Sequence, residues 1–111
     1  MSTIEWDDFQ RVELRVGTIL SAGPNTKAIK PAYVLEVDLG ELGVKTSSAQ
    51  ITAHYDAEVL VGRQVLCVCN FAPKRIAGVR SEVLVTGVHD VEGKVVLASF
   101  DMPLPNGARL A

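Results

Sequence analysis

Hydrophobic and polar residues alternate along much of this chain with the period of a β-strand. In the segment 31–40, PAYVLEVDLG, every second residue from Tyr33 is apolar, whereas Glu36 and Asp38 lie at positions between them. The segment 11–20, RVELRVGTIL, alternates in the same way. Because successive side chains of a strand point to opposite faces, each segment predicts a strand with one buried face.

Further elements follow in an informative order. Four more segments predict strands: 44–51 (VKTSSAQI), 63–71 (RQVLCVCNF), 81–90 (SEVLVTGVHD) and 94–100 (KVVLASF). The segment 53–62, AHYDAEVLVG, predicts a short helix that ends at Gly62. The order is thus three strands, a helix, two strands and one added strand. This order is typical of an all-β, five-stranded Greek-key barrel, the OB-fold, which carries its helix between strands three and four.

The chain has the size of one domain. We expect residues 1–111 to form a single OB-fold domain, with an N-terminal helical extension over 1–10, helical near Asp7–Gln10, and an extended tail over 102–111. The net charge is −2, so the chain is no generic polycation. Any contact with nucleic acid must therefore come from a local patch of positive charge.

The later strands are apolar on both faces. In the segment 63–71, apolar residues occupy consecutive positions, and the segments 81–90 and 94–100 share this property. A barrel interior takes only one face, and leaving the other in water costs roughly 25 cal/mol per Å². We expect Trp6 and Phe9 to cover part of it and a second copy of the chain, related by a two-fold axis, to cover the rest.

The connection between the fourth and fifth barrel strands mixes two kinds of residue. Lys74, Arg75 and Arg80 are interleaved with Ile76 and Val79. In an OB-fold this loop flanks the ligand face, where its cations could follow a phosphate backbone; solvated loop charge is the alternative. The two apolar residues either tuck under the loop, which we expect, or form an apolar groove suited to unfolded polypeptide.

Aromatic residues are scarce, at 5% of the chain. Only Tyr33 and Phe71 are candidates for stacking on bases, and we expect both in the core. Scarce aromatics argue for recognition of structured RNA by shape and charge over the reading of single strands. Lys27, Lys30 and Lys45 are further cations that could join the same rim.

The sequence supports no catalytic site. His54 and His89 are distant in sequence, and no phosphate loop, G-x-G-x-x-G or G-x-S-x-G motif is present. Cys67 and Cys69 lie two apart on one strand face, which suits reduced, buried thiols and neither a disulfide nor a zinc site. We therefore expect no enzyme, cofactor or metal. With no signal peptide or apolar span, we expect a cytoplasmic protein without membrane insertion.

Several segments together resemble a known superfamily. These are LRVGTI, YVLEVDLG, SSAQIT, LVGRQV, NFAPKRIAGVRSEVLV and PNGARL. They resemble the tRNA-binding domain superfamily, OB-folds that are appended to methionyl- and phenylalanyl-tRNA synthetases or stand free as dimers. Within it, the chain is similar to the export-related chaperones of the CsaA type. This resemblance implies a homodimeric, cytosolic, non-enzymatic protein that binds unfolded or exported polypeptides, with some affinity for tRNA.

We divide the candidate site residues between two ligands. The candidates for nucleic acid are Lys30, Lys74, Arg75, Arg80 and Ser81, and those for polypeptide are Phe71, Ile76 and Val79. At 81–84 the chain reads SEVL, where tRNA-binding relatives typically read S-x-G-M. The alternative function is therefore a free-standing tRNA-binding factor without chaperone action. Salt separates the two, because RNA held by several phosphates loses roughly a thousandfold affinity between 50 and 200 mM salt.

Overall fold

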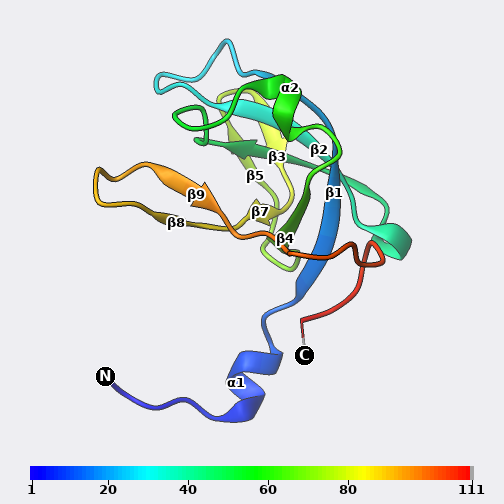
Figure 1. Ribbon diagram of the computed structural model, residues 1–111. Coiled ribbons are helices and arrows are strands. Elements are labelled where there is room, and N and C mark those ends of the chain that lie inside the picture. Colours follow the sequence, from blue (N-terminus) through cyan, green and yellow to red (C-terminus); the bar gives the residue numbers. More distant parts are fainter. Residues whose placement is uncertain (111) are drawn as a thin grey trace.

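The computed structural model describes residues 1–110 and shows a β-barrel with a helix projecting from it (Figure 1). The helical elements are α1 (Trp6–Gln10), the 3-10 turn η1 (Gly40–Leu42) and α2 (Ala57–Leu60). The strands are β1 (Leu14–Pro24), β2 (Tyr33–Asp38), β3 (Val44–Ala49), β4 (Gln64–Val68), β5 (Lys74–Ile76), β6 (Val79–Ser81), β7 (Leu84–Val85), β8 (Gly87–His89) and β9 (Val95–Leu97). Residue 111, the end of the predicted tail, lies outside the described residues.

The barrel is a five-stranded antiparallel sheet in the order β3-β2-β1-β4-β7. Beside its β3 edge runs the chain that follows β6. There the Glu82 N–H donates to the Thr46 carbonyl at 2.8 Å, and the Ser48 N–H donates to Ser81 Oγ at 3.2 Å. These bonds nearly close the sheet into a barrel. With α2 between β3 and β4, the OB-fold prediction is confirmed.

The alternation read from the segment 31–40 correctly identifies part of the core. Leu35, Val37 and Leu39 are fully buried, and so is Leu60 of α2. All four belong to one hydrophobic cluster inside the barrel. Burying each such side chain contributes about 1.5–3 kcal/mol, so this cluster holds the sheet curved around a common centre.

The segment 81–90, predicted as one strand, is divided. The N–H and Oγ of Thr86 both donate to the Leu66 carbonyl, at 3.0 and 2.8 Å, and so continue the register of β7 on β4 by one residue. At Gly87 a Cβ atom would lie 2.6 Å from Val95 Cγ1, a closeness that only glycine allows. The chain therefore leaves the barrel at Thr86, and β8 pairs with β9 in a separate hairpin.

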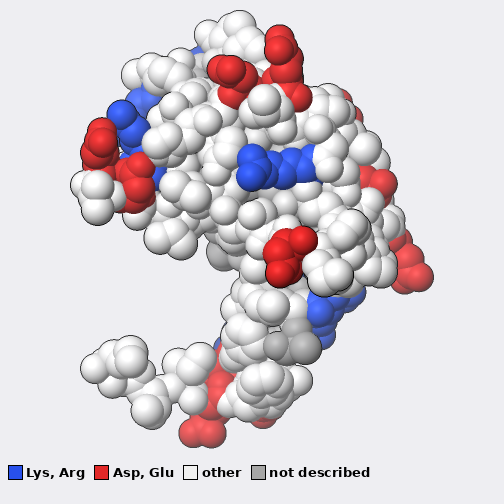
Figure 2. Space-filling view, viewed as in Figure 1, with Lys and Arg blue, Asp and Glu red and all other residues white. Residues whose placement is uncertain are grey.

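The second apolar face is exposed on the segments 81–90 and 94–100 but not on 63–71, where Val68 is buried. Leu84, Val88 and Val96 keep 49%, 73% and 46% of their surface. The expectation that Trp6 and Phe9 cover it is wrong, because α1 buries none of its residues. Trp6 packs instead against Phe9 at a ring distance of 5.4 Å, and the helix stands clear of the barrel (Figures 1 and 2).

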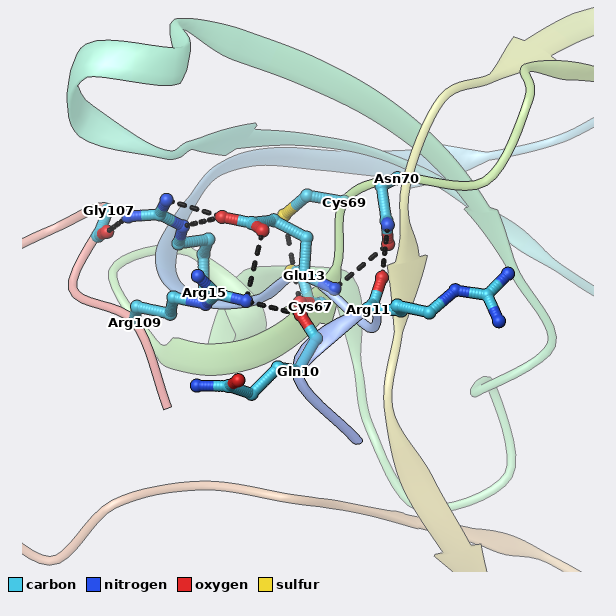
Figure 3. Close-up of polar contacts among 9 residues, drawn as sticks. All are labelled: Gln10, Arg11, Glu13, Arg15, Cys67, Cys69, Asn70, Gly107 and Arg109. Atoms are coloured by element: carbon cyan, nitrogen blue, oxygen red, sulfur yellow. Dashed lines mark hydrogen bonds and ion pairs between the residues drawn. The ribbon is translucent and has the colours of Figure 1, made fainter. Parts of the chain in front are cut away.

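Polar contacts at the start of β1 explain this placement (Figure 3). The Glu13 N–H donates to Asn70 Oδ1 at 2.9 Å, and Asn70 Nδ2 donates to the Arg11 carbonyl at 2.7 Å. Arg109 donates to the Gln10 carbonyl at 2.6 Å and pairs with Glu13 at 3.4 Å. The root of the helix is thus held firmly, pointing its first residues away from the sheet.

The C-terminal tail runs beside β1. The Val16 N–H donates to the Ala108 carbonyl at 2.9 Å, and the Gly107 N–H donates to the Val16 carbonyl at 2.7 Å. At the neighbouring turn η1, a Cβ atom on Gly40 would overlap the carbonyl of Asn106. The tail therefore extends the sheet and packs closely on this turn. Within residues 1–110, no helix has both the length and the apolar character to cross a membrane.

Candidate functional site: a cation-rimmed groove

The segment predicted as a connecting loop is a β-hairpin, β5–β6. Its turn consists of Ala77 and Gly78, whose φ angles are +47° and +81°. Two positive φ angles are typical of the tight turn that best matches the twist of two antiparallel strands. The turn was missed because its sequence, Ala-Gly, lacks the Asn or Asp that usually marks it. The candidate residues of this segment therefore lie on two regular, alternating strands.

The hairpin separates charge from apolar surface. The pairs on one face are Lys74 with Ser81 and Ile76 with Val79, and the pair on the other face is Arg75 with Arg80. This sorting follows from strand alternation, because directly opposed residues project from the same face. We call the first the groove face and the second the arginine face.

The groove face borders a hollow of about 430 Å³, the central groove. Its lining residues are Ser48, Phe71, Ala72, Lys74, Ile76, Ser81, Glu82, Val83 and Leu84. Phe71 and Ile76 are 60% and 37% exposed, so the expectations of a core Phe71 and a tucked Ile76 are wrong. Phe71 follows the end of β4, where the chain has left the barrel. Val79 is half-buried and is absent from the lining of this groove.

A second hollow of about 520 Å³, the lysine hollow, adjoins the central groove. It lies between the β1–β2 connection, which supplies Lys27 and Lys30, and the hairpin, which supplies Ile76. The contact between these segments is close, because a Cβ atom on Gly78 would lie 3.0 Å from Lys27 Cδ. Ser48 and Ile76 line both hollows. Lys30, predicted from sequence, is thus brought beside the hairpin.

Five cations border the two hollows and form what we call the cationic rim: Lys27, Lys30, Lys74, Arg75 and Arg80. Most of them lack an acidic partner. Among residues 1–110, those without a carboxylate within 4.0 Å are Lys27, Lys30, Lys74 and Arg75. All four are exposed. The Arg75 guanidinium donates to the Gly78 carbonyl at 3.2 Å, which fixes it over the turn. The rim therefore presents positive charge that is available to a ligand.

Glu82 brings one negative charge to the groove. It lies 3.8 Å from Arg80 and 4.0 Å from Lys45, and its carboxylate accepts the Thr46 N–H at 3.1 Å. Arg80 is therefore partly neutralised, while its side chain stays 66% exposed. Sequence reasoning treated Glu82 only as a departure from a motif. Its bond to Thr46 shows that it also holds the hairpin against β3.

Two predicted candidates have clear structural contacts. Ser81 accepts the Ser48 N–H, so it joins β6 to β3, and its predicted contact with nucleic acid stays a prediction. Tyr33 donates from its hydroxyl to the Tyr55 carbonyl at 2.8 Å and packs against the core, as expected. Leu84 was overlooked as a site residue, although its position on the second apolar face of its strand marked it as available.

The two free cysteines are affected by burial. Burial raises the pKa of Cys67 to about 12, and burial also raises the pKa of Cys69, so both free thiols stay protonated near neutral pH. His54 contacts Asp90 at 2.7 Å, linking the start of the α2 segment to the β8–β9 hairpin. In the part of the chain that is described, no three His, Cys, Asp or Glu side chains form a group able to hold a metal. What the groove presents to a ligand is its shape, its apolar surface and its positive charge.

Known proteins share most of this chain. Residues 14–109 match the family model described as "Putative tRNA binding domain". A methionine–tRNA ligase of Flavobacterium johnsoniae is 36% identical over 105 residues, which is 95% of this chain and 14% of that enzyme. Methionine–tRNA ligase 1 of Bacillus cereus is 38% identical over 94% of this chain and 15% of its own length. The chain thus spans about one seventh of the length of these relatives.

Solved structures match over nearly their full length. The chaperone CsaA of Bacillus anthracis is 47% identical, with a TM-score of 0.93, 99% of this chain covered and 100% of that one. The CsaA chaperone protein of Picrophilus torridus is 40% identical, with a TM-score of 0.91 and coverages of 98% and 100%. The sequence, the barrel and these likenesses agree: this chain belongs to the tRNA-binding domain family and is similar to the CsaA chaperones.

Proposed function

We propose that this chain is a non-catalytic, dimeric binding protein of the CsaA type, which works in the cytosol and holds unfolded or export-bound polypeptides in the central groove. The observation that carries the proposal is the exposure of Phe71, Ile76 and Leu84 around one hollow. Three large apolar side chains in water are costly unless a ligand covers them. An extended segment could place alternate side chains against them while its flanks meet the rim.

The dimer in this proposal rests on the second apolar face. Val88 and Val96 stay exposed on the β8–β9 hairpin, and α1 buries no residue that could cover them. A two-fold partner would bury such a face against its own copy, which is the commonest solution for a soluble protein. Light scattering at micromolar concentration tests it. A monomeric mass would refute the dimer, and replacement of both exposed valines by aspartate is expected to lower a dimeric mass towards that of one chain.

The alternative function is a free-standing tRNA-binding factor. The unpaired cations of the rim favour it, because they lie on two segments that could follow one phosphate backbone. The central groove offers RNA little else, since Phe71 is its single aromatic lining residue. We therefore place tRNA second, as a ligand of the rim, and extended polypeptide first, as the ligand of the groove.

Ile76→Asp tests the polypeptide function. A carboxylate in the groove should weaken binding of a reduced, carboxymethylated polypeptide about tenfold, because an exposed apolar anchor contributes roughly 1–2 kcal/mol. Fluorescence anisotropy of the labelled polypeptide measures it. Val91→Asp is the matched control, since Val91 is fully exposed in the β8–β9 turn. If both variants bind as the unaltered chain does, the central groove is not the polypeptide site.

A further inference from the structure

The N-terminal arm, residues 1–10, combines acidic and apolar side chains. Ile4 and Trp6 are 69% and 61% exposed, and α1 buries no residue. Glu5, Asp7 and Asp8 are its charged side chains, with no Lys or Arg among the ten. Figure 2 shows acidic side chains gathered on this projecting segment. The arm thus presents an acidic, apolar surface that its own barrel leaves uncovered.

The arm and the groove are complementary in charge and in polarity. Among residues 1–110, no side chain of the arm belongs to an ion pair, and neither do the four unpaired cations of the rim. Each surface also exposes large apolar side chains: Ile4 and Trp6 on the arm, Phe71 and Ile76 in the groove. One chain therefore carries both a ligand-like segment and a surface that fits it.

The arginine face adds a second reason to expect an anion here. Arg75 and Arg80 are directly opposed on one face of the hairpin. Like charges in this position repel and destabilise the strand pair. Of these two arginines, only Arg80 lies near Glu82, at 3.8 Å, so Arg75 has no carboxylate within 4.0 Å. A carboxylate supplied from outside would relieve this repulsion, but an occupant of the central groove meets Lys74, which lies on the other face of the hairpin and lines that groove.

Geometry assigns the arm to another copy. α1 projects below the barrel (Figure 1), and none of its residues lines the central groove of its own chain. Its root is nevertheless close to one end of the groove, because Asp8 and Arg11 line a hollow of about 450 Å³ together with Phe71. Ten residues span at most about 33 Å when extended. Across a two-fold axis near Phe71, each arm could reach the partner's groove reciprocally.

We propose that the N-terminal arm of a second copy occupies the central groove, with its carboxylates on the cationic rim, and acts as a displaceable internal competitor of polypeptide clients. This inference rests on the proposed function of the groove. A client must then displace the arm, so its apparent affinity is the intrinsic affinity multiplied by the fraction of open grooves. If the arm fills nine grooves in ten, removing its charge should strengthen client binding about tenfold.

Trp6 reports directly on the arm, because it is the single tryptophan of the chain. In the full-length protein, Lys74→Glu with Arg75→Glu is expected to shift its emission to longer wavelength, as the indole returns to water. Lys94→Glu, a reversal on the β8–β9 hairpin, should leave the emission unchanged. Adding Asp7→Lys and Asp8→Lys to the variant with Lys74→Glu and Arg75→Glu restores opposite charges on the two surfaces. It should therefore restore the original emission of Trp6.

Carbodiimide coupling of a mixture of isotope-labelled and unlabelled chains identifies the contact. We expect amide links between Lys74 of one isotope and Asp7 or Asp8 of the other, and tighter client binding when both aspartates become asparagine. Links confined to one copy, or unchanged Trp6 emission in the hairpin variant, would overturn the proposal. If that variant loses polypeptide binding with Trp6 unchanged, the arm inference alone fails. If Ile76→Asp also leaves polypeptide binding unchanged, the groove function fails with it.

Discussion

The salt dependence of tRNA binding gives a quantitative test of the cationic rim. The rim cations are Lys27, Lys30, Lys74, Arg75 and Arg80. Each phosphate contact contributes about 0.8 to the slope of log K against log salt, between the values for duplex and single strands. Five contacts give a slope of about −4, so affinity should fall about 250-fold between roughly 50 and 200 mM salt.

Lys74→Ala with Arg75→Ala removes two of these contacts. The slope should fall to about −2.4, and the loss over the same fourfold change in salt to about 30-fold. Arg80 stays in place but is partly neutralised by Glu82. If Arg80 makes no phosphate contact, the slope of the unaltered chain is shallower by the value for one contact, about 0.8. The difference in slope between the unaltered chain and the alanine variant does not depend on this effect of Glu82, because Glu82 is present in both proteins.

Fluorescence anisotropy of labelled tRNA at four salt concentrations measures both slopes. The matched control is Lys94→Glu, which changes the net charge by the same two units on the β8–β9 hairpin, where Lys94 is 49% exposed. The control should keep the slope of the unaltered chain. An unchanged slope in the alanine variant, or an equal reduction in the control, would show that tRNA responds to net charge and not to this rim.

Three further predictions concern the scaffold, each followed by urea unfolding. Ala77→Asn should stabilise the hairpin by about 1 kcal/mol, because asparagine tolerates positive φ better than alanine; Ala53→Asn should give no such gain. Gly40→Ala should cost about 1–3 kcal/mol more than Gly43→Ala, since both have positive φ but only the first overlaps the tail. Asp90→Asn should reduce the loss of stability between about pH 4 and 2. Backbone N–H bonds and His54 lower the pKa of this carboxyl to about 2, so its contribution is present above its unfolded pKa and lost below it.

Local alternation was enough to predict the barrel. Leu35, Val37 and Leu39 fall on one side of their strand in the sequence and are fully buried in the structure. The pattern succeeds because a barrel strand has one interior and one exterior face, so burial follows sequence parity. The second apolar face of the later strands was inferred on the same basis, and Leu84 and Val88 on that face are exposed, whereas Val68 is buried.

The divided strand and the hairpin were not predictable in this way. The segment 81–90 leaves its barrel partner after Thr86, because from Gly87 onward it pairs with β9. The turn at Ala77 places alanine at positive φ, against its local preference. Both features depend on contacts that hydrophobic periodicity does not record. The placement of α1 is similar, because bonds from Asn70 and Arg109 fix its direction.

The sequence pointed to residues that lie beside the two hollows but not to their arrangement. Lys74, Arg75 and Ile76 were predicted together, but only the hairpin register shows that Lys74 and Ile76 share a face that Arg75 does not. Phe71 was assigned to the core, because the sequence of its segment does not show that β4 has already ended. Lys27 reaches the site through its contact with Gly78, which joins segments 51 positions apart.

The separation of the two hairpin faces bears on how two ligands would share the site. A polypeptide in the central groove covers Ile76 and Lys74, while Arg75 and Arg80 project from the opposite face. An RNA held by the arginine face alone would leave the groove open, and both ligands could bind at once. An RNA that also used Lys74 and the lysine hollow would compete with polypeptide. The test is whether tRNA and polypeptide compete for the unaltered chain and no longer compete for Lys74→Ala. That result would identify Lys74 as the residue that both ligands use.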